Sequence, residues 1–214
     1  RMIIEVCAES YEYAVKADKA GADRIELCKD LHLDGLTPDY ETAKKTIDSL
    51  NIPVFILIRP REGDFIYSDE EFELMKSDIV KFKEMGCKGI VSGVLNSDYS
   101  IDIKRTKDLV ELSKPLEFTF HRAFDVVNDP LIEIENLIEL DVDRILTSGQ
   151  KYKAIEGLDL LLELKNISKN RLVIMPGSGI NKSNIINFRG FDEVHGTFNR
   201  CLKYVVNISK TTTK

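Results

Sequence analysis

Long hydrophobic runs are missing from this sequence of 214 residues. No apolar stretch approaches the roughly 20 residues that a helix needs to span a bilayer. The amino end, from Arg1 to Glu5, lacks the basic, apolar and small-residue regions of a secretory signal. These absences predict a cytoplasmic protein with no membrane anchor.

Positive charge is also in short supply, because the formal net charge is -6 and the pI is about 5.3. Nucleic acids and anionic membranes are bound by clustered positive potential, which this chain does not offer overall. Neither a nucleic acid nor a membrane is therefore an expected partner. The expected ligand is small.

Closely spaced cysteines are missing as well. The four cysteines are Cys7, Cys28, Cys87 and Cys201, and no CxxC pair occurs. This spacing argues against a zinc knuckle and a small disulfide scaffold, and it favours reduced thiols in a cytosol. An HExxH helix and a serine–histidine–acid order are also missing, so the residues do not define a reaction type.

What is present is enough apolar material for one core, since hydrophobic residues make up 43% of the chain. We expect a single domain over residues 1–214. Arg1, which precedes Met2, is expected to be a residue added ahead of the natural start. Residues from roughly 200 to 214 are expected to form a polar tail.

Short β-branched runs alternate with longer amphipathic segments, and each pair occupies about 25 residues. Strands are predicted at residues 3–7, 24–28, 54–58, 89–91, 116–121, 144–147, 172–175 and 193–195. Helices are predicted at residues 10–20, 39–50, 69–85, 103–113, 130–140, 153–167 and 182–188.

This alternation predicts an α/β protein. Strands linked by helices run parallel, and eight successive units favour a (β/α)8 barrel of the TIM type over a doubly wound open sheet. The polar tail offers no eighth helix, so we expect irregular closure at the C-terminal end. The long polar connection 59–69 after the third strand suggests a lid.

Strand parity separates the barrel interior from the helix-covered outside. Glu5 and Cys7 share one face of the first strand, and Glu26 and Cys28 share the corresponding face of the second. Because the opposite faces are apolar and suited to helix packing, these four side chains are expected to point inward. The two cysteines are expected at equal depth near the carboxyl ends, with the carboxylates one layer deeper.

More polar groups end other strands, since Arg59 ends the third, His121 the fifth and His195 the eighth. Buried charges cost several kcal/mol without partners, so these groups must pair with one another or engage a ligand. One interpretation is a structural ion-pair network. The other is a functional site at the carboxyl ends, where barrel enzymes place their chemistry, with Glu5, Glu26 and His121 as acid–base candidates.

The two matched cysteines predict metal binding. Neighbouring parallel strands lie about 4.8 Å apart, so thiolates from Cys7 and Cys28 would converge on one soft ion such as Cu(I). His121 or His195 would add a further ligand. The alternative is that each cysteine is a small buried hydrophobe, which is also our interpretation of Cys87 and Cys201.

A glycine-rich turn with Gly177, Ser178 and Gly179 follows the seventh strand. Its backbone N–H groups and the positive end of the predicted helix 182–188 would bind an anion, and phosphate sites often follow strands seven and eight of such barrels. The alternative is that a tight turn simply requires glycine.

Other candidate anion-binding residues share the same rim of the barrel. They are Arg59, Arg61, Asp64, Arg122, Asp125, Ser148 and Gly149. Together with the glycine-rich turn they predict, as an alternative to copper binding, an enzyme that acts on a small anionic or phosphorylated metabolite at the C-terminal face. No nucleotide cofactor is indicated.

Several motifs, in order along the chain, resemble the CutC family of copper homeostasis proteins. They are EVC at 5–7, AGADRIELC at 20–28, GLTP at 35–38, IRPREGDFIYSD at 58–69, FTFHRAFD at 118–125, RILTSGQ at 144–150, MPGSGI at 175–180 and EVH at 193–195. The resemblance runs from Met2 to about His195 and is highly specific.

The resemblance implies a cytoplasmic barrel that forms a homo-oligomer, a dimer or tetramer, and takes part in copper homeostasis. The cysteines for which the family is proposed to bind Cu(I) correspond to Cys7 and Cys28. Copper handling does not account for the acid, arginine and histidine groups, so the enzyme alternative stays open. The chain departs from the family at Glu62, where relatives often carry glycine, and after His195, where the familiar closing segment is missing.

Overall fold

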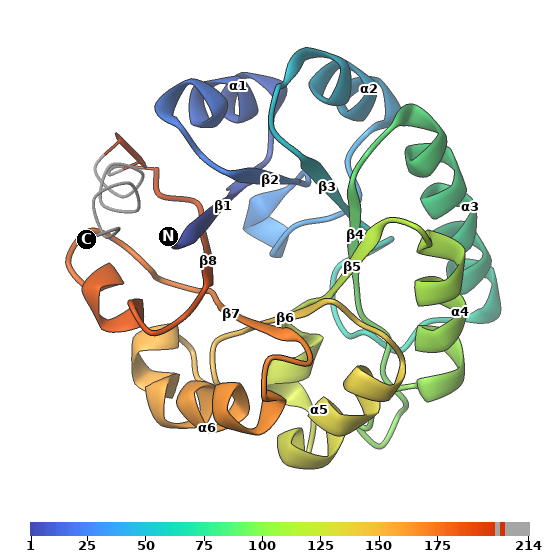
Figure 1. Ribbon diagram of the computed structural model, residues 1–214. Coiled ribbons are helices and arrows are strands. Elements are labelled where there is room, and N and C mark those ends of the chain that lie inside the picture. Colours follow the sequence, from blue (N-terminus) through green and yellow to red (C-terminus); the bar gives the residue numbers. More distant parts are fainter. Residues whose placement is uncertain (200–201, 204–214) are drawn as a thin grey trace.

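Eight parallel strands form a nearly closed barrel in the computed structural model, which describes residues 1–199 and 202–203 (Figure 1). The strands are β1 (Ile3–Ala8), β2 (Arg24–Leu27), β3 (Val54–Leu57), β4 (Gly89–Ser92), β5 (Glu117–Phe120), β6 (Arg144–Thr147), β7 (Val173–Pro176) and β8 (Glu193–Gly196). Their order is β7-β6-β5-β4-β3-β2-β1-β8. The predicted (β/α)8 barrel is confirmed.

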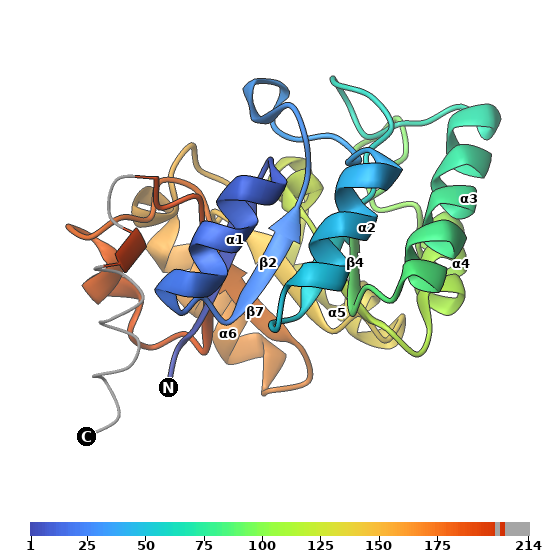
Figure 2. The same cartoon turned by 90° about the horizontal axis from the view of Figure 1, so that it is seen from above.

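Six α-helices surround the strands in the part of the chain that the structure describes (Figures 1 and 2). They are α1 (Tyr11–Ala20), α2 (Tyr40–Ser49), α3 (Asp69–Met85), α4 (Ile103–Ser113), α5 (Pro130–Glu139) and α6 (Leu158–Ser168). Short 3-10 turns lie at η1 (Leu31–Leu33), η2 (Arg122–Val126), η3 (Ala154–Gly157) and η4 (Ile185–Phe188). None of the described helices has the length and apolar character needed to cross a bilayer.

The ends of the helices follow from local chemistry. Ser68 and Glu71 form a capping box at the start of α3, with each side chain accepting a hydrogen bond from the other's backbone N–H. Gly21 and Gly86 end α1 and α3 with φ of 98°, a left-handed conformation that costs glycine little.

One predicted helix is wrong. Residues 182–188 contain only the four-residue turn η4, and asparagine side chains make local hydrogen bonds with the backbone just before it. The amide oxygen of Asn184 accepts from the Asn181 N–H at 2.9 Å, and the Asn184 amide nitrogen donates to the Gly179 carbonyl at 2.9 Å. The predicted helix 153–167 is also divided, into η3 and α6.

The barrel closes without a complete ring of hydrogen bonds. β8 pairs with β1 and lies beside β7 in Figure 1, but no ladder between β7 and β8 occurs among the described residues. The irregular closure that we expected is this seam. Of the expected tail, only Leu202 and Lys203 fall within the described residues, so the rest of that prediction lies outside them.

Strand parity is confirmed in β1 and β2. Ile4, Val6, Ile25 and Leu27 are fully buried in the main core between strands and helices. The opposite face of the same strands points into the barrel, where Cys7 and Cys28 join a second apolar cluster with Phe55, Leu57 and Val91. The helix-facing core therefore fixes which side chains enter the interior.

The interior also holds an ion-pair network. The Arg24 guanidinium donates to Glu5 at 2.6 Å and to Glu193 at 2.9 Å, and the Arg144 guanidinium donates to the other oxygen of Glu193 at 2.7 Å. Both guanidinium groups lie over the ring of Phe55, at 4.7 and 5.3 Å from its centroid. Since Arg144 belongs to β6 and Glu193 to β8, an ion pair spans the seam beside β7.

Replacement of Glu193 by glutamine is expected to destabilise the barrel strongly. Breaking a buried ion pair from one side typically costs about 3–5 kcal/mol, because the partner charge stays buried. Urea unfolding of Glu193→Gln measures the loss. The matched control is Glu135→Gln, which breaks the half-exposed pair with Arg171 and should cost far less because solvent screens that pair. Equal losses for both variants would contradict a structural role for the network.

Candidate metal centre

Two thiols face each other inside the barrel. The Sγ atoms of Cys7, on β1, and Cys28, directly after β2, lie 3.8 Å apart. The register pairs Cys7 with Glu26, so Cys28 lies two residues further along its strand than the equal depth we expected. Neighbouring strands of a barrel are staggered in this way. The thiols meet across that stagger, and both are buried and free of disulfides.

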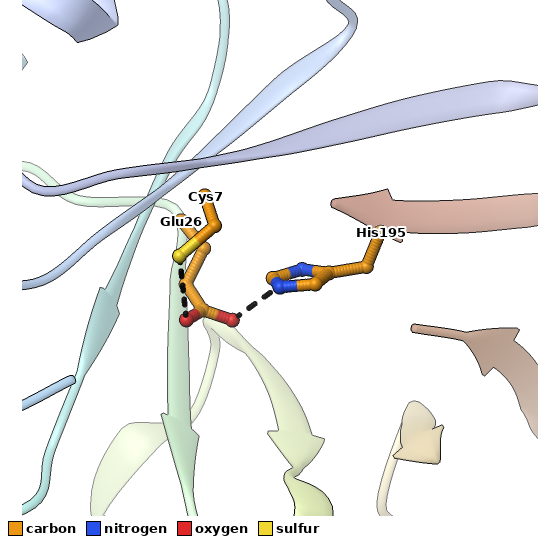
Figure 3. Close-up of side chains that lie close together, drawn as sticks. All are labelled: Cys7, Glu26 and His195. Atoms are coloured by element: carbon orange, nitrogen blue, oxygen red, sulfur yellow. Dashed lines mark hydrogen bonds and ion pairs between the residues drawn. The ribbon is translucent and has the colours of Figure 1, made fainter. Parts of the chain in front are cut away.

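A carboxylate and an imidazole complete the group. Cys7, Glu26 and His195 each offer a ligand atom, and these atoms lie within 4.8 Å of one another (Figure 3). The Cys7 thiol lies 4.0 Å from Glu26 Oε1, and His195 Nδ1 lies 3.8 Å from Glu26 Oε2. Because β8, β1 and β2 are consecutive in the sheet, three adjacent strands supply the donors.

His195 is held in place from below by Glu5. Its Nδ1 lies 2.7 Å from Glu5 Oε1, and the other oxygen of Glu5 accepts from Arg24 at 2.6 Å. Although complete burial opposes ionisation, Arg24 and His195 together lower the pKa of Glu5 to about 2. Glu5 is therefore a fixed negative charge that orients the imidazole.

Cys7, Glu26 and His195 form an upper layer, nearer the carboxyl ends of the strands than Glu5. Their pKa values are raised, whereas that of Glu5 is lowered. Burial raises the pKa of Glu26 to about 7, and the nearby charge of Glu5 acts in the same direction. The hydrogen bond with Cys28, and then burial, raise the pKa of Cys7 well above its usual range. Burial opposes the charged form of His195, but Glu26, Cys7 and Glu5 outweigh it and raise the pKa of the imidazole. A metal that binds here must displace protons.

Glu26 has one oxygen without a hydrogen bond. Its Oε2 atom is buried and has no hydrogen-bond partner, because the nearest cationic group, His195 Nδ1, is 3.8 Å away. A buried polar atom without a partner is unfavourable by about 1–3 kcal/mol. The position is therefore suited to an additional cation.

The loop between β2 and α2 covers the thiols. In Figure 1 this light-blue segment lies across the middle of the barrel, and Leu31 in it packs against the apolar cluster that contains Cys7 and Cys28. Lys29 and Leu36 exchange backbone hydrogen bonds at 2.9 and 2.8 Å, which closes the loop on itself. We call residues 29–36 the cover loop.

Arg59 ties the cover loop to the loop after β3. Its Nη1 donates to the carbonyls of Leu33 at 2.7 Å and Gly35 at 3.0 Å, and its Nη2 donates to the Gly63 carbonyl at 3.0 Å. Figure 2 shows both loops rising from the same end of the barrel. The buried guanidinium that we expected to bind an anion thus makes contacts within the protein.

The neighbouring candidates Arg61 and Asp64 also bind each other. Arg61 Nη2 lies 3.0 Å from the Asp64 carboxylate, and Arg61 Nε donates to Glu71 at 2.6 Å. These contacts fold the segment after β3 back onto the start of α3. The segment 59–69 interpreted as a lid is therefore fixed to α3 and, through Arg59, to the cover loop.

A separate group of candidate anion-binding residues lies in the loops that follow β5 and β6. Arg122 donates to Asp125 at 2.7 Å and to the Ser148 hydroxyl at 3.2 Å. The Asp125 carboxylate also accepts from the Ser148 and Gln150 backbone N–H groups, which shapes the turn through Gly149. This carboxylate organises a loop.

The glycine-rich turn lacks the helix on which the anion prediction depended. The Gly177 N–H donates to the Thr147 carbonyl at 3.1 Å, the Ser178 hydroxyl donates to the Tyr152 carbonyl at 2.8 Å, and Gly179 has φ of 68°. In residues 1–199, no hydrogen bond or ion pair joins this turn to the arginines at the rim.

His121 lies apart from the thiol group. It follows β5 and caps η2, where its Nδ1 accepts from the Ala123 N–H at 3.1 Å, and its ring lies 5.0 Å from that of Phe65. Burial, together with the charges of Arg59 and Arg122, lowers the pKa of His121 to about 3. The structure thus brings His195 to the cysteines and leaves His121 outside the three-residue group.

Three interior residues were missed by our sequence reasoning. Arg24 has the same parity as Glu26, and Glu193 the same parity as His195, so the rule applied to the thiols would have found both. Arg144 begins its strand, and its inward position follows from the same alternation once a partner is known. No local pattern indicated that Leu31 would cover the thiols.

Comparison with known proteins gives a consistent result. The CutC family model matches residues 2–200. A human copper homeostasis protein cutC homolog is 47% identical over 183 residues, covering 86% of this chain and 67% of that protein. A CutC family protein of Pasteurella multocida is 43% identical, covering 91% of this chain and 81% of its own length. The crystal structure of CutC from Streptococcus agalactiae has a TM-score of 0.87 and 33% identity, covering 92% of this chain and 99% of that one.

Replacement of Arg59 by glutamine is expected to expose the thiols. Loss of about 1.4 kcal/mol from hydrogen bonds to the cover loop would raise its open population about tenfold. Iodoacetamide should then label Cys7 and Cys28 about tenfold faster, as measured by mass spectrometry of the peptides. Arg61→Gln is the matched control, and buried Cys87 reports global unfolding. Equal acceleration at Cys87 would show that the fold, and not the cover loop, has opened.

The low pKa of His121 predicts acid sensitivity. Above pH 6.5 this histidine is neutral in both states. As the pH falls from 6.5 towards 3, the unfolded chain gains a proton that the folded chain does not, so stability decreases by up to about 1.4 kcal/mol per pH unit. Urea unfolding at several pH values should give a shallower slope for His121→Asn, whose amide oxygen can still cap η2.

Proposed function

This chain belongs to the CutC family of copper homeostasis proteins, and on that premise we propose that it binds Cu(I) between Cys7 and Cys28. The observation that carries the proposal is the 3.8 Å separation of two buried, unoxidised thiols. Thiolates are the soft ligands that Cu(I) prefers. The copper ion is the cargo of this site.

The surroundings suit a bound soft cation. His195 supplies an imidazole beside Cys7, and Glu5 and Arg24 hold that imidazole in position. A hydrogen bond from the ring to a fixed carboxylate orients a histidine that binds a metal. The cover loop places Leu31 against the thiols, which limits contact with water.

The relatives support the same assignment. The human protein that is 47% identical to this chain carries the name of a copper homeostasis protein. The family resemblance also supports a cytoplasmic location and a homo-oligomer, dimer or tetramer, as parts of this proposal. Neither a nucleic acid nor a membrane is a proposed partner, in keeping with the net charge of -6.

The alternative enzyme on an anionic metabolite receives less support. The donors of Arg59 that have partners face backbone carbonyls, and Arg61 and Arg122 face carboxylates of the protein. The predicted helix at residues 182–188, whose amino end would have attracted a phosphate, is replaced by the four-residue turn η4. We therefore do not propose this activity.

Anaerobic titration against a competing Cu(I) chelator tests the proposal. The parent should withdraw copper from the chelator, and the double variant Cys7→Ser/Cys28→Ser should lose this ability. Cys87→Ser removes a buried thiol elsewhere and should behave as the parent does. Equal copper binding by the double variant and the parent would refute the site.

A further inference from the structure

The donors around Cys7 form two different sets. Cys7 and Cys28 provide two sulfur atoms, whereas Cys7, Glu26 and His195 provide sulfur, oxygen and nitrogen within 4.8 Å of one another. Cys28 is not a member of the second set. Cys7 is the residue that the two sets share, so one position in β1 serves both.

The second set is less suited to Cu(I) than the first, because it contains a carboxylate. Carboxylate oxygen is a hard ligand that favours divalent cations over Cu(I). Zinc accepts cysteine, histidine and glutamate together, and zinc sites with three protein ligands keep a fourth position for water or a substrate. The chemistry of Glu26 therefore indicates a different metal from that of Cys28.

The oxygen of Glu26 that lacks a partner provides independent support. Glu26 is 5% exposed, and its Oε2 has no hydrogen-bond partner although it points toward the imidazole in Figure 3. A cation bound by the Glu26 carboxylate would place positive charge beside this atom. No protein group among the described residues donates a hydrogen bond to it.

The distances require only small movements. A tetrahedral zinc ion with Zn–S of about 2.3 Å and Zn–O of about 2.0 Å places sulfur and oxygen about 3.5 Å apart. The observed separation of Cys7 Sγ and Glu26 Oε1 is 4.0 Å. An approach of about half an ångström, which is within the reach of the flexible Glu26 side chain, forms the pair.

The support of His195 also matches a metal ligand. Histidines that bind metals almost always use their second ring nitrogen to donate to a carboxylate or a carbonyl. His195 Nδ1 is 2.7 Å from Glu5 Oε1, and Glu5 is itself fixed by Arg24. This arrangement fixes the orientation of the ring next to Cys7 and Glu26, and with Nδ1 engaged by Glu5 it leaves Nε2 as the nitrogen for a metal.

We propose that Cys7, Glu26 and His195 form a binding site for a divalent cation of the zinc class. Because both metals require Cys7, a divalent cation bound at this site excludes Cu(I). The zinc site stands on its own donors and does not depend on the copper proposal. Only the mutual exclusion of the two metals rests on the copper proposal. Glu26 is then the residue that distinguishes the divalent metal from the monovalent one.

The experiment titrates Zn²⁺ into reduced, chelator-treated protein in competition with a metallochromic indicator, and Cu(I) into the same variants. Glu26→Gln, which keeps the size of the side chain, should weaken Zn²⁺ binding at least about tenfold and leave Cu(I) binding unchanged. Cys28→Ser should weaken Cu(I) binding and leave Zn²⁺ binding unchanged. Cys7→Ser should lose both metals, and Cys87→Ser neither.

Two results would overturn the zinc site: no Zn²⁺ binding by the parent, or equal Zn²⁺ affinity in the parent and Glu26→Gln. Failure of Cu(I) binding with intact Zn²⁺ binding would refute the copper proposal alone. Simultaneous binding of both metals would refute their exclusion.

A measurement on the parent protein avoids any doubt about folding of the variants. Zn²⁺ should slow the alkylation of Cys7 by iodoacetamide more than it slows the alkylation of Cys28. Equal protection of the two thiols would contradict the assignment of Cys7, and not Cys28, as the zinc ligand. Far-UV circular dichroism of each variant confirms that the barrel is intact.

Discussion

The ion pair between Arg24 and Glu5 is the interaction on which the interior of the barrel depends. It keeps Glu5 charged in a fully buried position, and the charged carboxylate in turn holds His195 beside Cys7. Arg24 also reaches Glu193, which Arg144 contacts from β6. One guanidinium thus links the orientation of a candidate metal ligand to the closure of the barrel, so stability and binding chemistry have a common origin.

The interior is arranged as two layers with different chemistry. The lower layer pairs full charges of opposite sign, as a low-dielectric environment requires. In the upper layer the pKa values of the Cys7 thiol and the Glu26 carboxyl group are raised, so these two groups tend to keep their protons until a cation replaces them. The lower layer can therefore remain assembled whether or not a metal is bound above it.

Much of this arrangement follows from alternation along single strands. Parity placed Glu5, Cys7, Glu26 and Cys28 inside, and repetition of βα units predicted the barrel. The stagger between Cys7 and Cys28 could not be predicted, because it arises from the register of neighbouring strands around the whole ring. The same limit applies to the cover loop and Arg59, whose contacts join residues 24 and 26 positions apart. The false helix at 182–188 shows that an apolar pattern alone does not specify a helix, since only the short turn η4 forms there.

The seam between β7 and β8 lies to one side of the strands that carry the candidate metal donors. β8 is hydrogen-bonded to β1, and β1 to β2, so the three strands that carry the donors form one continuous ladder on a single side of the seam. The hydrogen bonds that are missing between β7 and β8 therefore do not fall between any two of the strands that carry the donors, and the mutual spacing of the donors is set by complete ladders.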